Sequence, residues 1–154
     1  MPTNCIEDLA VTDQTHPIAT PAQAHPVGFV GLGIMGRPMA LNLRRAGGPL
    51  FGHPRRAEAI APPVTAGAFA CATPAEVANQ VDILFTMVAD TADVEHVILG
   101  HAGILAGARH GLAVVDMSTI SAAPTRGMAP RPADHGGELL DAPVSGGETG
   151  AIQG

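Results

Sequence analysis

The stretch that decides the fold is VGFVGLGIMGRPMALNLRRAG, residues 27–47. It opens with a short apolar run, Val27–Val30, and passes into a glycine-rich segment over residues 31–36. Beyond that segment, apolar residues recur at the spacing of one helical face, at Met39, Leu43 and Ala46. A pair of glycines at positions 47 and 48 then marks the end of the helix. The stretch therefore predicts a strand, a glycine turn and a helix, in that order.

This order of elements is the one that a dinucleotide-binding unit requires. Gly31 allows a tight turn out of the strand, Gly33 lets a pyrophosphate approach the backbone, and Gly36 lets the helix pack closely on the strand. The N–H groups and the dipole at the helix start would face the phosphates. The residues predicted to bind the cofactor here are Gly31, Leu32, Gly33, Ile34, Met35 and Gly36. The alternative is a glycine-rich turn that binds nothing.

The composition is that of one ordinary globular domain. The chain has 154 residues, of which 46% are hydrophobic, and this is enough for a good core. Its formal net charge of −6 disfavours nucleic acid as a partner. All eight basic residues are arginines, and the sequence contains no lysine, tryptophan or tyrosine.

The sequence shows no targeting or membrane signal. It has no run approaching the roughly 18 apolar residues of a membrane helix, and its first residues lack the pattern of a secretory signal. Its two cysteines, Cys5 and Cys71, do not establish a disulfide, so we expect a reduced, cytoplasmic protein without a membrane partner. Residues 1–25 hold three prolines and show no clear period. We expect a mobile leader there, ahead of a single domain over residues 26–154.

Apolar runs and helical segments alternate along the rest of the chain. Strands are expected at residues 27–30, 49–52, 68–71, 81–88, 112–117 and 139–142. Helices are expected between them, including one over residues 57–61 that stops at Pro62 and Pro63, and one over about 121–128. A capping pattern, Thr73–Glu76, predicts a helix that runs to about residue 80, and another helix is expected over residues 91–99. This alternation predicts an α/β fold with a Rossmann-like, doubly wound parallel sheet. A ligand would bind at the carboxyl ends of the strands.

The end of the second expected strand lacks an acidic residue. An acid about 20 positions after the glycines usually binds the ribose hydroxyls in this kind of fold. Here the region reads FGHPRR over residues 51–56, and it holds Arg55 and Arg56 instead. An arginine at this place can accommodate a 2′-phosphate, so NADP is favoured slightly over NAD. The alternative, weighted nearly equally, is that both arginines belong to a solvated helix start.

Three further stretches carry a family resemblance: MVADTADVEHVIL (residues 87–99), VDMSTIS (115–121) and LLDAPVSGGETGAIQG (139–154). Together with GLGIMGRPMALNL (31–43), they resemble the β-hydroxyacid dehydrogenase family, in particular its 3-hydroxyisobutyrate dehydrogenase and 2-hydroxy-3-oxopropionate (tartronate semialdehyde) reductase branches. The DAPVSGG stretch is far more specific than the glycine fingerprint. The resemblance covers residues 27–154. It implies an oxidoreductase that transfers a hydride between NAD(P)H and a short 3-hydroxy acid or semialdehyde.

The resemblance also implies roles for residues that follow the later strands. Val88 and Ala89 would line the nucleotide. Asp93 matches a position where the family often has a polar cofactor contact, and Thr119 would lie near the nicotinamide. The substrate carboxylate would be held by a hydroxyl and backbone N–H groups, contributed by Ser145, Gly146 and Gly147. The alternative for this last stretch is a glycine-rich turn before a helix, and no metal site is expected.

The sequence departs from the family pattern in two respects. His53 and Pro54 stand where the family typically has Asn-Arg after the second strand. The family's catalytic lysine and its second, all-helical domain belong beyond the DAPVSGG stretch, and this sequence has no lysine. Reduction of an aldehyde needs a proton donor near the developing alkoxide. None of the histidines is a convincing donor, so no catalytic residue is assigned; they are His16, His25, His53, His96, His101, His110 and His135.

Three hypotheses follow for the chain. It is the amino-terminal cofactor domain of such an oxidoreductase, truncated before the catalytic lysine, or a non-catalytic nucleotide-binding module, or a decayed and inactive fragment. We favour the first and expect the chain to be inactive by itself. Because the family's helical domain would be missing, we expect exposed apolar surface and self-association.

Overall fold

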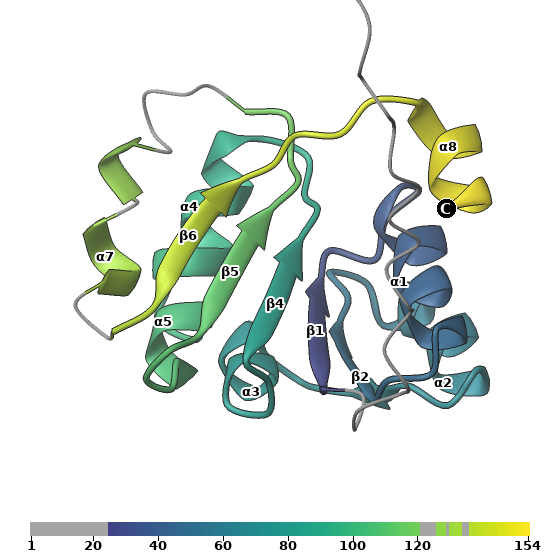
Figure 1. The fold of residues 1–154 in the computed structure, drawn as a ribbon, viewed down its shortest axis with the longest axis horizontal. Helices are drawn as coiled ribbons and strands as arrows, with labels where there is room; N and C mark the ends of the chain where they lie inside the picture. The colour runs from purple at the N-terminus through teal and green to yellow at the C-terminus, as the bar shows by residue number, and fades with distance from the viewer. Residues whose placement is uncertain (1–24, 121–125, 129, 134–135) are drawn as a thin grey trace, which may run out of the picture.

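The computed structural model describes residues 25–120, 126–128, 130–133 and 136–154. Its centre is a parallel sheet of six strands in the order β3-β2-β1-β4-β5-β6 (Figure 1). The strands are β1 (Val27–Val30), β2 (Leu50–His53), β3 (Phe69–Ala70), β4 (Ile83–Thr86), β5 (Ala113–Asp116) and β6 (Glu138–Asp141). The chain runs outward from β1 to β3, then returns to begin β4 beside β1. This confirms the predicted Rossmann-like, doubly wound α/β fold.

Helices cover both faces of the sheet (Figure 1). One face carries α3 (Pro74–Ala78), α4 (Thr91–Leu99) and α5 (Ile104–Gly107). The other carries α1 (Gly36–Arg45), the 3-10 turn η1 (Ala57–Ile60), α2 (Ala61–Thr65) and α8 (Gly147–Gln153). The short helix α7 (Pro130–Ala133) contacts β6 at the edge of the sheet. Among the helices of the described residues, none is long and apolar enough to cross a bilayer.

Alternation along the inner strands divides the core into two clusters. Val30, Leu84 and Val114 point to the face that α3, α4 and α5 cover, and each is at most 1% exposed. Phe29 points to the other face, where it packs with Ala40 of α1. Strand β1 is therefore buried on both sides, whereas β4 and β5 are buried on the side of α3, α4 and α5 and at most half-buried on the other. Because both faces of these strands carry apolar side chains, their sequences read as nearly continuous apolar runs.

Local signals fix where several of the helices begin or end. Gly47, at a φ of 106°, ends α1 by donating its N–H to the carbonyl of Arg44 at 3.1 Å. Thr73 caps α3 by accepting the N–H of Glu76 at 3.1 Å. In the same way, the side chain of Asp90 accepts the N–H of Asp93 at 2.9 Å and caps α4.

The expectation that Pro62 and Pro63 stop a helix is wrong. The expected helix is the 3-10 turn η1, and both prolines lie in the first turn of α2, which begins at Ala61. A first turn tolerates proline because its N–H groups have no partner within the helix. Most of the expected leader (residues 1–24) and the first part of the expected helix over 121–128 (121–125) lie outside the described residues.

Candidate dinucleotide-binding site

The site lies at the carboxyl edge of the sheet, where every strand ends on the same side. Register aligns the last residues of five neighbouring strands, His53, Val30, Thr86, Asp116 and Asp141. The predicted site residues follow these ends: the glycine turn after β1, residues 88, 89 and 93 after β4, residue 119 after β5 and residues 145–147 after β6. The fold thus brings four separate stretches to one edge. Strand order reverses between β1 and β4, and open α/β sheets bind ligands at such a point.

The three glycines of the first turn have different surroundings. Gly31 has a φ of 96°, and a Cβ there would overlap the carbonyl oxygen of Met87. A Cβ on Gly36 would overlap the carbonyl oxygen of Gly31 and lie 2.9 Å from Cε1 of Phe29. A Cβ on Gly33, by contrast, would meet no atom of the described residues within 4 Å. The first and third glycines are therefore required by the fold, whereas the second leaves open space above the backbone.

The start of α1 is electrostatically suited to an anion. Its first turn contains no acidic residue, and it carries the exposed side chain of Arg37. The N–H groups of a first helical turn have no intrahelical partners, and the helix dipole adds partial positive charge there. Arg37 was missed in the sequence interpretation, although its position directly after the third glycine was a usable signal.

A buried polar network joins the ends of β4 and β5. The hydroxyl of Thr86 donates to Oδ1 of Asp116 at 2.7 Å, and the N–H of Ser118 donates to the same oxygen at 3.1 Å. The hydroxyl of Ser118 in turn accepts the N–H of Val88 at 3.0 Å. Asp116 is 1% exposed, and its Oδ2 has no hydrogen-bond partner among the described residues. The network fixes the segment that holds Val88 against the segment that leads to Thr119.

Sequence reasoning missed this network as well. Thr86 and Asp116 each close an apolar strand, and a polar residue at that position looks like the simple end of a strand. The usable signal was that both strands were predicted to be buried on both faces. A polar side chain at such a place needs a hydrogen-bond partner.

An ion pair links the loop after β2 to helix α4. Nη1 of Arg55 lies 3.0 Å from Oδ2 of Asp93. The side chain of Arg55 is 80% exposed, whereas that of Asp93 is 28% exposed. Since β2 and β4 are the two neighbours of β1, this pair spans the end of β1. The structure therefore brings together two residues that the sequence interpretation treated separately.

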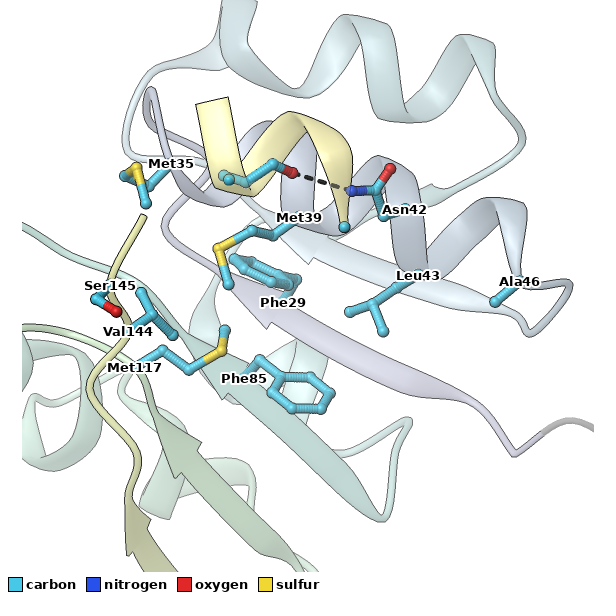
Figure 2. Close-up of a pocket in the computed structure, with 13 residues that line it drawn as sticks. Phe29, Met35, Met39, Asn42, Leu43, Ala46, Phe85, Met117, Val144 and Ser145 are labelled. Atoms are coloured by element: carbon cyan, nitrogen blue, oxygen red, sulfur yellow. Dashed lines mark hydrogen bonds between the residues drawn. The ribbon is translucent and has the colours of Figure 1, made fainter. Parts of the chain in front are cut away.

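The DAPVSGG stretch leads from β6 into α8. Gly146 and Gly147 have φ values of 115° and 60°, a region that favours glycine. Ser145, Gly146 and Gly147 are all exposed. Figure 2 shows α8 lying against α1, where Nδ2 of Asn42 donates to the carbonyl of Ala151 at 2.9 Å. That bond fixes the direction in which the chain leaves the glycine pair.

A cavity of about 430 Å³ lies between α1, α8 and the sheet (Figure 2). Met35 of the glycine turn, Met117 after β5 and Ser145 all line it, so three of the stretches meet there. Most of its lining is apolar, including Phe29 and Phe85 of the inner strands. Such a lining suits apolar groups rather than phosphates, so the cavity adjoins the glycine turn but is not itself a phosphate site.

The described residues offer neither a metal centre nor an activated thiol. They contain no group of three or more histidine, cysteine or acidic side chains placed to hold a metal ion. Burial, and secondarily the charge of Glu76, raise the pKa of the Cys71 thiol. A thiol with a raised pKa stays protonated and is a poor nucleophile.

The fold and the carboxyl edge place the chain in the class of Rossmann-type dinucleotide-binding domains. Residues 26–154 match the family model described as the NAD binding domain of 6-phosphogluconate dehydrogenase. The chain is 44% identical over 132 residues to 2-hydroxy-3-oxopropionate reductase of Escherichia coli, which covers 83% of this chain and 44% of that protein. The chain thus belongs to the β-hydroxyacid dehydrogenase family, as the NAD-binding domain of that family.

Solved structures agree with this assignment. The structure of Mycobacterium tuberculosis 3-hydroxyisobutyrate dehydrogenase with L-serine superposes with a TM-score of 0.78 at 32% identity, covering 84% of this chain and 44% of that one. Psf3 in complex with NADP+ and 2-OPP superposes with a TM-score of 0.77 at 30% identity, covering 82% and 45%. By their names, the reductase and the dehydrogenase are oxidoreductases. The chain spans less than half the length of each.

Proposed function

We propose that this chain is the cofactor-binding part of an oxidoreductase that interconverts a short 3-hydroxy acid and its semialdehyde. The observation that carries this proposal is the contrast among the glycines of the first turn. The backbone at Gly31 and Gly36 leaves no room for any side chain, whereas the backbone at Gly33 faces open space at the start of α1. A pyrophosphate needs that close approach to the backbone, and the positive end of a helix stabilises it.

The residues of this edge fit NAD or NADP. Gly31, Leu32, Gly33, Ile34, Met35 and Gly36 would hold the pyrophosphate, with the charge of Arg37 adding to the helix dipole. Val88 and Ala89 would border the nucleotide, Asp93 would serve its adenosine end, and Thr119 would lie near the nicotinamide. When bound, the cofactor supplies the hydride. The chain's own contribution is to hold and orient it at the strand ends.

The exposed segment after β6 is the proposed substrate side. Ser145 would donate its hydroxyl, and Gly146 and Gly147 their N–H groups, to a substrate carboxylate. Support comes from the shared cavity, because Ser145 and Met35 line the same space. The names of the relatives, such as 2-hydroxy-3-oxopropionate reductase, fit a small carboxylate substrate.

The proposed cofactor preference is a slight one for NADP. Arg55 and Arg56 follow β2, where a 2′-phosphate would lie, and the sequence supplies no acid in that loop. A charge-assisted contact to the 2′-phosphate is worth about 1.5–3 kcal/mol. The solved structures that resemble this chain include one in complex with NADP+.

Binding and turnover test different parts of the proposal. Binding can be followed by the fluorescence of the reduced nicotinamide of NADH and NADPH, and the protein adds no tryptophan or tyrosine emission of its own. We expect both to bind with Kd values within about 1 µM to 1 mM, the ordinary range of Michaelis constants. Failure of the protein to bind either dinucleotide would contradict the proposal.

We propose that this chain by itself does not catalyse hydride transfer at an enzymatic rate. The developing alkoxide needs a proton donor, and the sequence has no lysine. Of the histidines in the described residues, His53 binds the carbonyl of Cys71 through Nδ1, and His96 is exposed on α4. With NADPH and tartronate semialdehyde, turnover within about 1–10³ per second would contradict this proposal. Binding without turnover would favour the cofactor domain or a non-catalytic module over a decayed fragment.

A further inference from the structure

The acid that the loop after β2 lacks is supplied from the opposite side of β1. Asp93 stands in the first turn of α4, after β4, and its Oδ2 lies 3.0 Å from Nη1 of Arg55, after β2. The two residues are 38 positions apart in the sequence. No pattern within the β2 loop could therefore have shown that a carboxylate is present there.

We propose that Asp93 determines cofactor selectivity by holding Arg55 away from the 2′-position of the adenosine ribose. The inference rests on the proposed binding of a dinucleotide over the glycine turn. Arg55 is the guanidinium that a 2′-phosphate would recruit, and in the free protein it is engaged by Asp93. NADP(H) must therefore displace a carboxylate that NAD(H), with its 2′-hydroxyl, can use as an acceptor, which keeps the proposed preference for NADP slight.

Arg55 is freer to move than Asp93. The first turn of α4 holds Asp93, because its N–H is bound by the side chain of Asp90 at 2.9 Å. Its side chain is 28% exposed, so neighbouring residues cover most of its surface. Arg55 is 80% exposed and can turn away from its partner. A bound 2′-phosphate would thus move Arg55 and leave Asp93 in place.

The negative charge of Asp93 should affect the binding of the two cofactors in opposite ways. An ionised carboxylate has only acceptors, so it can accept a hydrogen bond from a ribose hydroxyl, but it repels a phosphate. Removing the charge at Asp93 should release Arg55 and end that repulsion. Both effects favour NADPH binding, so both should raise the ratio of the affinity for NADPH to the affinity for NADH.

The test is Asp93→Asn, which keeps the shape of the side chain and removes its charge. We expect the ratio of NADPH affinity to NADH affinity to rise by about fivefold at low salt. A change of that size corresponds to the strongest of the ion pairs measured at exposed surfaces. The rise should shrink at high salt because exposed charges are screened. Arg55→Ala should lower the ratio. In the Arg55→Ala background, Asp93→Asn should give less than half of its original gain.

Asp90→Asn is the matched control. It removes one negative charge three residues away, and asparagine is an equally good cap for α4. The inference is overturned if Asp93→Asn raises the ratio no more than Asp90→Asn does, or if its gain is the same with and without Arg55. Either result would leave dinucleotide binding intact. Absence of binding of both dinucleotides to the wild type would instead contradict the proposed function, and the inference with it.

Discussion

The hydrogen bond between Thr86 and Asp116 ties together two strand ends that border the proposed nicotinamide position. Thr86 is fully buried, and Asp116 receives its hydroxyl at 2.7 Å. A hydrogen bond to a charged group contributes about 1.5–3 kcal/mol. We therefore expect Thr86→Val, which has nearly the same shape, to lower the free energy of unfolding by about 2 kcal/mol, as measured by urea denaturation.

Thr65→Val provides the comparison for this prediction. The hydroxyl of Thr65 also donates a hydrogen bond, at 3.0 Å to the carbonyl of Ala61, but on the exposed surface of α2. Loss of that bond should change the free energy of unfolding by no more than about 0.5 kcal/mol. Equal losses in the two variants would show that burial of the carboxylate does not decide the effect.

The structural role of a single residue could be predicted from the sequence where the backbone geometry accepts only one residue type. Gly31 and Gly36 are glycines because the carbonyl oxygens of Met87 and Gly31 occupy the space of a Cβ, as the fingerprint indicates. The pairing of Arg55 with Asp93 could not be predicted. It depends on the distance between two loops, and neither loop carries a local signal of the other.

Helix α8 accepts hydrogen bonds from the side chain of Asn42 on α1. It has only seven residues, and so short a helix is marginal without tertiary support. Asn42 supplies that support through the carbonyl of Ala151. We expect Asn42→Ala to increase the rate of amide hydrogen exchange in α8 by about fivefold, the equivalent of one net hydrogen bond of about 1 kcal/mol.

Arg45→Ala serves as the control for this element. Nη1 of Arg45 donates to Oδ1 of Asn42 at 2.9 Å, but it makes this contact at the exposed surface. Exchange in α8 should be nearly unchanged in that variant. If Asn42→Ala leaves α8 as protected as in the wild type, then the apolar contacts around Ala151 hold the helix on α1, and the account of this element is wrong.

At the scale of elements, periodicity and capping signals located most helices and strands. Helix α4 was expected over residues 91–99 and occupies those residues, and the Thr73–Glu76 capping pattern begins α3 as predicted. Strand ends were less accurate, since the run over 81–88 forms hydrogen-bonded strand only at Ile83–Thr86. The residues beyond Thr86 leave the sheet to form the site. The half-buried loop at Met87 and Val88 has the same apolar composition as a strand.

The whole molecule leaves one apolar face open between α1, α8 and the sheet (Figure 2). Open apolar surface of this kind promotes association. We expect sedimentation velocity to show concentration-dependent self-association, weakened by Met39→Gln within the cavity. Val64→Gln, on the 43% exposed side chain of α2, should have little effect because Val64 does not line the cavity. A wild-type protein that stays monomeric at every concentration would contradict this expectation.

The architecture as a whole could be predicted because alternating strands and helices allow few arrangements. A glycine turn after the first strand and right-handed crossovers together lead to the observed strand order. The apolar cavity could not be predicted in this way. Its walls come from α1, β1, β4 and the segment after β6, and their separation is a property of packing rather than of pattern.

The central claim is that a dinucleotide binds over Gly33, and one comparison tests it most directly. Within the part of the chain that the structure describes, a Cβ at Gly33 or at Gly127 would meet no atom within 4 Å, so valine should be tolerated by the fold at both positions. Melting temperatures can verify this. Fluorescence titration of NADH and NADPH should then give unchanged Kd values for Gly127→Val and at least a 100-fold loss for Gly33→Val, about 2.7 kcal/mol. Equal binding by the wild type and Gly33→Val would contradict the claim.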